Sequence, residues 1–199
     1  MRQTQSMTAI PPPAVPELTV ADAAAWRRWL QEHDAGSNGV WLVLAKKGVQ
    51  SPTSLTYAQA LEEALCSGWI DGRRNSVDQA TYRQHFTPRR ARSLWSKRNI
   101  ELTVGLIDAS RMRERGYAEI ARAKADGRWD SAYSGAAALE VPTDLQAALD
   151  AEPAAAAAFA ALSRTARYPV LLQVVTAPND AVRAARILRL AARLAEGNG

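Results

Sequence analysis

The clearest hydrophobic segment of the chain is the run VWLVLA at residues 40–45, which turn residues bound on both sides. Its length and its β-branched and aromatic content are typical of a buried strand. Further along, Trp69-Ile70 and the alternating stretch at residues 81–86 also have strand composition, and a polar loop near Asn75 joins them. We therefore expect one small sheet of about three strands, in which both later segments pair with residues 40–45.

Helical periodicity dominates the rest of the chain. A helix is expected at about residues 22–33, where Thr19 can cap the first turn. Another begins at Thr56, which forms a capping-box pattern with Gln59. Further helices are expected at residues 96–107, 114–125, 145–150, 153–163, 170–175 and 180–196. The pattern predicts an α+β fold: a small sheet of about three strands packed with helices, followed by a helical C-terminal region.

Composition predicts three parts along the chain. Residues 1–18 are polar and then rich in proline, which indicates a disordered lead-in and not a signal peptide. Residues 19–135 are expected to form the α+β domain, and residues 136–199 a helical region packed on it. The single cysteine, Cys66, excludes an intrachain disulfide. No segment is apolar over the length that a membrane span needs, so we expect a soluble cytoplasmic protein without membrane insertion.

The positive charge of the chain is concentrated in its middle third. The formal net charge is +5, and residues 71–130 hold fourteen basic and eight acidic residues. The segments before and after them are almost balanced. Such a region attracts polyanions or acidic ligands. A usage rich in Ala and Arg often reflects a GC-rich genome, and a modest positive charge is common in proteins that bind nothing anionic, so the charge alone does not decide the function.

One block, residues 68–99, combines eight basic residues with two tryptophans, a tyrosine, a phenylalanine and a histidine. Guanidinium groups suit bidentate contacts with phosphate or carboxylate. Basic residues interleaved with aromatic faces hold single-stranded nucleic acid without reading its sequence. The aromatic faces available for stacking are those of Tyr82, His85, Phe86 and Trp95.

A structural interpretation competes with this one. In an ordinary fold some of these arginines pair with Asp71, Asp78 or the acids of neighbouring helices, and Trp69 and Trp95 are core residues. Asp71 lies at a strand end beside arginines, where it can serve as a general base or, more simply, orient an arginine or cap a turn.

The candidate ligand-binding site combines this block with two lysines that follow the first strand. No phosphate loop, serine-triad spacing or metal-ligand spacing is present, so no catalytic residue is assigned and neither a metal nor a cofactor is expected. The candidate residues are Lys46, Lys47, Asp71, Arg89, Arg90, Arg92, Trp95 and Asn99.

Four arginines of the last helix recur at helical spacing and share one face: Arg183, Arg186, Arg189 and Arg193. The simplest interpretation is the solvated face of an amphipathic helix, and a second phosphate-binding surface is the alternative.

Several blocks of the sequence resemble a known family. They are WRRWL (26–30), GVWLVLAKK (39–47), SLTYAQALEEALCSGWIDG (54–72), FTPRRARSLWSKRN (86–99) and AKADGRW (123–129). On these blocks, and on a weaker similarity through the C-terminal helices, the chain resembles the YdeI/OmpD-associated (bacteriocin-protection, OmdA-type) family. The resemblance implies a role in bacterial stress tolerance and a porin-type or other envelope partner, and it brings no catalytic residue.

Three functions follow from these observations. The leading hypothesis is a binding module for an anionic partner, which is nucleic acid, a phosphorylated ligand or an acidic protein surface. The second is a small-molecule enzyme, and the third is a structural scaffold for an envelope partner. An exposed face of arginine and aromatic side chains favours nucleic acid, whereas arginines buried in ion pairs favour the scaffold. The enzyme would need a deep pocket lined by Asp71, Arg89, Arg90, Trp95 and Asn99.

Overall fold

The computed structural model describes residues 15–135 and 139–197 of the chain. Two compact units divide it: the first comprises residues 1–90 and 111–119, and the second comprises residues 91–110 and 120–199. The chain therefore passes between the units more than once. The boundaries expected from composition, after residues 18 and 135, stay a prediction.

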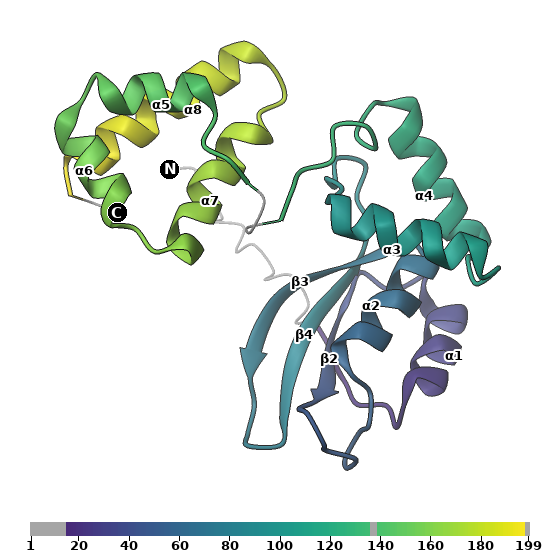
Figure 1. Cartoon of the computed structure of the whole chain (residues 1–199). Coiled ribbons are helices and arrows are strands. Elements are labelled where there is room, and N and C mark those ends of the chain that lie inside the picture. The colour runs from purple at the N-terminus through teal and green to yellow at the C-terminus, as the bar shows by residue number, and fades with distance from the viewer. Residues whose placement is uncertain (1–14, 136–138, 198–199) are drawn as a thin grey trace, which may run out of the picture. The chain divides into compact units, whose positions relative to one another are not determined.

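A four-stranded sheet with the order β1-β2-β4-β3 forms the centre of the first unit (Figure 1). Strand β4 (Thr81–Pro88) lies between β2 (Val40–Ala45) and β3 (Trp69–Ser76) and is antiparallel to both. The α+β class is confirmed, and the three expected segments lie in one sheet. Residues 81–86 pair with residues 40–45 as expected, but the expected pairing of Trp69-Ile70 with residues 40–45 is wrong, because β3 pairs with β4. The sheet has one strand more than expected, because β1 (Glu17–Leu18) pairs in parallel with β2. Two residues are too few to show a period of two, so the sequence pattern does not reveal β1.

The hairpin between β3 and β4 is longer than its composition indicated. Asn75 belongs to β3, and the turn lies at residues 77–80. The Oδ1 atom of Asp78 accepts hydrogen bonds from the backbone N–H groups of Thr81, at 2.7 Å, and Ala80, at 2.8 Å. These bonds favour the ionised carboxylate and lower the pKa of Asp78 below its ordinary value. Asp78 is therefore a turn-forming residue.

Helices α1 (Ala23–His33) and α2 (Tyr57–Cys66) begin with side-chain caps. The expected capping box of Thr56 and Gln59 is present at α2. The expectation that Thr19 caps α1 is wrong, because the carboxylate of Asp22 accepts the hydrogen bond from the N–H of Ala25 at 2.8 Å. Thr19 directly follows β1, so the chain is still extended there.

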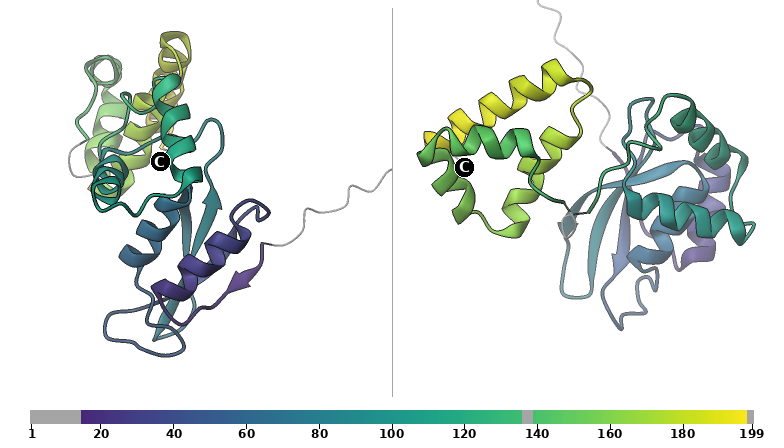
Figure 2. Two further views of the ribbon diagram at one scale, coloured as in Figure 1. Left: turned by 90° about the vertical axis from the view of Figure 1, so that its right-hand side faces the viewer. Right: turned by 45° about the horizontal axis from the view of Figure 1, so that its top comes forward.

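Both helices lie on the same face of the sheet (Figures 1 and 2). Trp26 of α1 meets Trp69 edge to face, with ring centroids 6.2 Å apart, and packs against Phe86 of β4 at 5.8 Å. The indole N–H of Trp26 donates to the carbonyl oxygen of Ala60 at 3.1 Å. All three rings are fully buried, which confirms that Trp69 is a core residue.

The second unit is helical, and its elements match the expected segments closely. Helix α4 (Glu114–Ala125) crosses the boundary between the units. The expected helix at residues 170–175 is the second half of α7, which begins earlier because Ser163 caps it and Pro169 is tolerated inside it. The helices that belong entirely to this unit are α3 (Lys97–Asp108), α5 (Thr143–Asp150), α6 (Pro153–Ala161), α7 (Arg164–Val175) and α8 (Asp180–Ala195).

Helices α5 to α8 enclose a hydrophobic core of their own. Every one of them contributes to it, with Leu145 and Leu149 from α5, Phe159 from α6, Val174 from α7 and Leu194 from α8. The right-hand view of Figure 2 shows the four helices gathered around this core. The expected helical C-terminal region is therefore confirmed.

Candidate anion-binding site

The two lysines that follow β2 have different surroundings. The Nζ atom of Lys46 donates to the backbone oxygen of Asp78 at 2.6 Å, and its backbone N–H donates to Ala80 at 2.9 Å. Lys46 therefore ties the end of β2 to the β3–β4 turn. Lys47 is exposed in the turn that follows.

Asp71 is engaged by a helix and not by an arginine. Its Oδ2 atom accepts a hydrogen bond from the hydroxyl of Tyr57, at 2.8 Å, so it joins β3 to α2. Across the described residues, neither Asp71 nor Asp78 forms an ion pair with an arginine. The arginines of the 68–99 block are therefore not neutralised by the two acids that the structural interpretation assigned to them.

Arg89 and Arg90 follow one another and have opposite surroundings. Arg89 is only 4% exposed, and its backbone N–H donates to the carbonyl oxygen of Gly68 at 3.0 Å. Arg90 is exposed and close enough to His85 for its positive charge to lower the pKa of the imidazole. The predicted site grouped Arg89, Arg90 and Arg92. Two of them lie in the first unit, where Arg89 is buried and Arg90 is exposed.

The sheet face opposite Trp26 and the helices carries basic and aromatic side chains. Side chains alternate along a strand, so Trp41, Arg83 and His85 lie on the face away from Phe86. Trp41 of β2 is paired with His85 of β4, and their rings are 5.1 Å apart. The guanidinium of Arg83 lies 5.0 Å from the centre of the Trp41 ring, and that of Arg73 lies 5.9 Å from it.

We call Trp41, Arg73, Arg83, His85 and Arg90 the basic sheet face. Sequence reasoning had named Arg90 as a site residue and His85 as a stacking face, and had not named the other three. The alternation of buried and half-buried positions along β4 was the signal that could have found Arg83, and Trp41 of the uniformly apolar β2 follows from its pairing with His85. This pairing became usable only once the register between the two strands was known.

His85 is held as a neutral ring at the centre of this face. Burial lowers its pKa below the ordinary value, and the nearby charges of Arg73 and Arg90 lower it further. A Cβ atom added to Gly39 would lie 3.3 Å from the ring nitrogen Nε2 and 2.8 Å from the methyl group of Thr87. Gly39 also has a φ of 135°, so glycine is needed there for both its backbone angle and its size.

The two arginines beside Trp41 differ in their acidic partners. Arg83 forms an ion pair with Glu17 of β1 at 2.6 Å. Within the described part of the chain, Arg73 has no acidic partner, and its recorded contact is the Trp41 ring. The face therefore keeps a positive charge beside an aromatic surface, which is the combination that attracts a planar anionic ligand.

The other three predicted site residues belong to the second unit. Arg92 is exposed. Trp95 is 2% exposed and packs against Trp129 at 4.8 Å, so its expected burial is confirmed. Asn99 lies in the first turn of α3, where its backbone N–H donates to the Ser96 hydroxyl at 3.2 Å. Trp95 is thus a packing residue of this unit.

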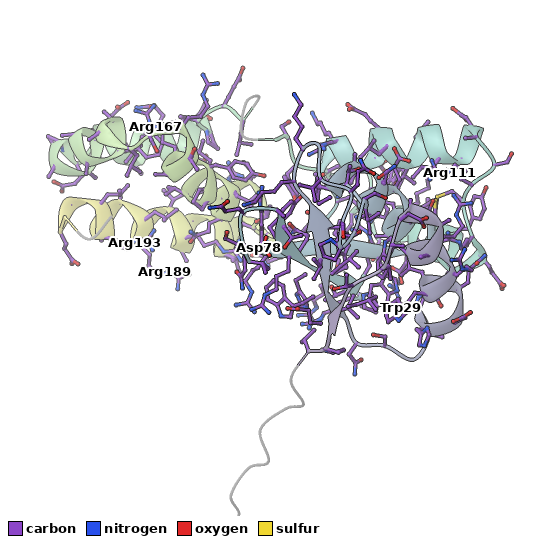
Figure 3. All side chains as sticks on the ribbon, turned by 90° about the horizontal axis from the view of Figure 1, so that it is seen from below. Trp29, Asp78, Arg111, Arg167, Arg189 and Arg193 are labelled. Carbon is purple, nitrogen blue, oxygen red and sulfur yellow. The ribbon has the colours of Figure 1, made fainter. Side chains whose placement is uncertain are left out.

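A second group of arginines, which the sequence analysis did not identify, surrounds Glu63 of α2. The side chain of Glu63 is 1% exposed and receives one guanidinium from each of three arginines. The distances are 2.6 Å from Arg27 of α1, 2.7 Å from Arg111 and 2.5 Å from Arg113. We call these four residues the Glu63 cluster; Figure 3 labels Arg111 within it.

The Glu63 cluster holds the fold together. Burial by itself would raise the pKa of Glu63, but the hydrogen bonds from Arg27, Arg111 and Arg113 outweigh it and lower that pKa. The cluster joins α1 and α2 to the segment that precedes α4. The thiol of Cys66 is buried behind it, and burial, aided by the charge of Glu63, raises the pKa of that thiol. Cys66 is therefore a core residue.

Metal sites and membrane spans are two further features that the described residues can be checked against. No group of three or more His, Cys, Asp or Glu side chains in residues 15–135 and 139–197 is arranged to hold a metal ion. None of the helices in these ranges is both long enough and apolar enough to cross a membrane.

Comparison with known proteins finds two family models that match different segments of the chain. Residues 138–197 match the family described as "Bacteriocin-protection, YdeI or OmpD-Associated", which confirms the resemblance seen in the sequence. Residues 18–119 match a family described as "Domain of unknown function (DUF8412)". No curated protein and no solved structure matches the chain. The chain belongs to the DUF8412 family, whose model covers half of it, and it carries a YdeI/OmpD-associated segment in its C-terminal helices.

Proposed function

We propose that the protein binds single-stranded nucleic acid on the basic sheet face. The observation that carries this proposal is the arrangement around Trp41, where two guanidinium groups and the His85 ring lie within 6 Å of the indole. Bases stack on aromatic and guanidinium planes whatever their sequence, and cationic groups beside them neutralise phosphates.

The chemistry of the face divides between stacking and charge. Trp41 and the neutral His85 supply aromatic planes at the centre, while Arg73 and Arg90 supply positive charge beside them. Arg83 is already held by Glu17, so it contributes mainly by stacking on Trp41. A strand surface of this kind favours an extended, unpaired nucleic acid strand over a compact phosphorylated ligand, which needs a concave site.

The two alternatives have less support. The enzyme hypothesis relied on Asp71 and Arg89, but Asp71 is bonded to Tyr57 and Arg89 is buried. The scaffold hypothesis relied on arginines buried in ion pairs, but of the arginines that pair with the buried Glu63, Arg27 is 48% exposed and Arg111 is 35% exposed. A cytoplasmic location and a role in stress tolerance are part of our proposal, because single-stranded nucleic acid is available there.

The test is a salt titration with a fluorescein-labelled single-stranded oligonucleotide, followed by fluorescence polarisation. Each phosphate contact with a single strand contributes about 0.7 to the slope of log K against log salt, so the double variant Arg73→Ala with Arg90→Ala should flatten that slope by about 1.4. Trp41→Ala should weaken binding by about tenfold or more, since stacking of one base is worth about 1–3 kcal/mol.

The matched control is Arg28→Ala, which removes an exposed arginine from α1, on the helical side of the sheet. It should leave affinity and salt dependence nearly unchanged. If the parent protein shows no binding at low salt, or if Arg28→Ala weakens binding as much as the sheet-face variants do, the proposal is refuted.

A further inference from the structure

We propose that the groove between α7 and α8 binds an acidic amphipathic helix of a partner protein. The groove encloses about 850 Å³. Helix α7 lines one side with Pro169, Leu172, Gln173 and Thr176, and α8 lines the other with Arg186, Arg189, Leu190, Ala192, Arg193 and Glu196. The groove lies wholly within the C-terminal helices, so this proposal does not depend on the sheet face.

The α8 side of the groove is a row of positive charge. Arg186, Arg189 and Arg193 are spaced by three and four residues, so they follow one line along the helix. The row is about 10 Å long, since each helical residue rises 1.5 Å. Figure 3 labels Arg189 and Arg193 on successive turns of α8. These three arginines are the members of the predicted arginine face of the last helix that line the groove, where a partner can contact them.

Arg183 has a different role from the three arginines that follow it. It forms an ion pair with Asp144 of α5, at 2.5 and 2.9 Å, and does not line the groove. Arg186 donates only to the backbone oxygen of Gln173, at 2.7 Å, and Arg189 to that of Ala185, at 3.3 Å. No acid among the described residues forms an ion pair with Arg186, Arg189 or Arg193. Their charges are left for an external partner.

The lining of the groove indicates which kind of anion it takes. The half-buried Leu172 supplies an apolar strip between the two helices, with Leu190, which belongs to the core, at its base. The lining contains no aromatic side chain on which a base could stack. A single phosphate or small carboxylate could contact only one of the three arginines. Because the arginine row is about 10 Å long, only an elongated partner can contact all of it. A helix with acids one turn apart beside a leucine stripe satisfies both the arginine row and the apolar strip.

The test uses the full-length protein and a fluorescein-labelled 18-residue helical peptide with Glu residues one turn apart beside a leucine stripe. A second peptide carries Lys at the Glu positions. Fluorescence polarisation should show that the parent binds the Glu peptide and not the Lys peptide. The double variant Arg189→Glu with Arg193→Glu should bind the Glu peptide at least about tenfold more weakly, since each rim ion pair contributes up to about 1 kcal/mol and reversal adds repulsion. The same variant should gain binding to the Lys peptide.

The matched control is Arg28→Glu with Arg164→Glu, which changes the net charge equally at exposed positions outside the groove. It should bind the Glu peptide like the parent. Gln173→Trp, at an exposed position of the lining, should weaken binding by filling the groove without changing charge, and melting curves show whether each variant folds. Equal weakening by the control pair, or no binding by the parent, overturns the proposal. Concentration-dependent dimerisation that Arg189→Glu with Arg193→Glu abolishes, with no peptide binding, also overturns it and assigns the groove to a second copy of the chain.

Discussion

The first unit contains two groups of arginines whose surroundings are opposite. In the Glu63 cluster, guanidinium groups converge on one buried carboxylate, and their hydrogen bonds are directed into the protein. On the basic sheet face, the guanidinium groups of Arg73 and Arg83 lie against an indole ring, and of these two Arg83 is paired with Glu17. The difference shows that the partner of an arginine, and not its neighbours in the sequence, decides whether it stabilises the fold or is available to a ligand.

The largest effect is expected from neutralising the carboxylate of the Glu63 cluster. Glu63→Gln should lower the free energy of unfolding by roughly 3–5 kcal/mol, because removing one partner of a buried ion network leaves uncompensated charge. Urea unfolding at pH 7 measures it. The control is Glu62→Gln, since Glu62 pairs with Arg111 but is about one-third exposed, and this change should cost less than about 1 kcal/mol.

The same cluster should make stability depend on pH in the acid range. The folded-state pKa of Glu63 is lowered from 4.5, so its contribution is present above pH 4.5 and is lost as the pH falls through the folded-state value. The difference between the parent and Glu63→Gln should therefore shrink in acid. A cost that is equal for Glu62→Gln and Glu63→Gln would mean that the cluster is not the main support of this region.

An intermediate effect should separate two neighbouring arginines. Arg89→Ala should lower the free energy of unfolding by about 2 kcal/mol, because it removes a buried side chain and its packing. Arg90→Ala should change it by less than about 0.5 kcal/mol, since Arg90 is exposed. Thermal melting of both variants measures the contrast. Equal losses in the two would place Arg90 in the interior and remove it from the basic sheet face.

The smallest effect is expected from His85. Its pKa is lowered in the folded state, so the unfolded chain takes up the proton more readily below about pH 6.5, and stability falls as the pH drops through that region. His85→Gln should flatten the stability profile between pH 7 and pH 5, by at most about 1 kcal/mol. Denaturant midpoints at a series of pH values test this. A profile that is unchanged by the substitution would contradict the assignment of His85 as a neutral ring.

Strong local signals allowed most of the fold to be predicted. Val40–Ala45 is a continuous apolar run between turns, and Thr56 with Gln59 is a complete capping box, so both elements were found where expected. The start of α1 was misassigned because Thr19 and Asp22 are both good caps and only the preceding strand decides between them. Local sequence carries little information about a two-residue strand held in place by its neighbour.

The candidate site could be predicted only in part, because its members meet across the sheet. Trp41 and His85 are far apart in the sequence and are neighbours only through the β2–β4 register. The same holds for Glu63, whose partners Arg27 and Arg111 come from well before and well after it. The density of basic residues in the 68–99 block pointed to the hairpin of β3 and β4, on which the proposed site lies. It could not rank the arginines, since burial separates Arg89 from Arg90.

The first unit is built from two separate stretches of the chain, and this affects how it can fold during translation. Residues 1–90 contain Glu63 and Arg27, but Arg111 and Arg113 come from the later stretch, after α3 of the second unit. A nascent chain that has been synthesised only to residue 90 therefore contains Glu63, which is buried in the complete fold, and only one of its three arginine partners, Arg27. The first unit can be completed only after a piece of the second has been synthesised. Translation from the N-terminus thus does not finish one unit before it starts the other, and a fragment cut at residue 90 lacks part of the interior it needs.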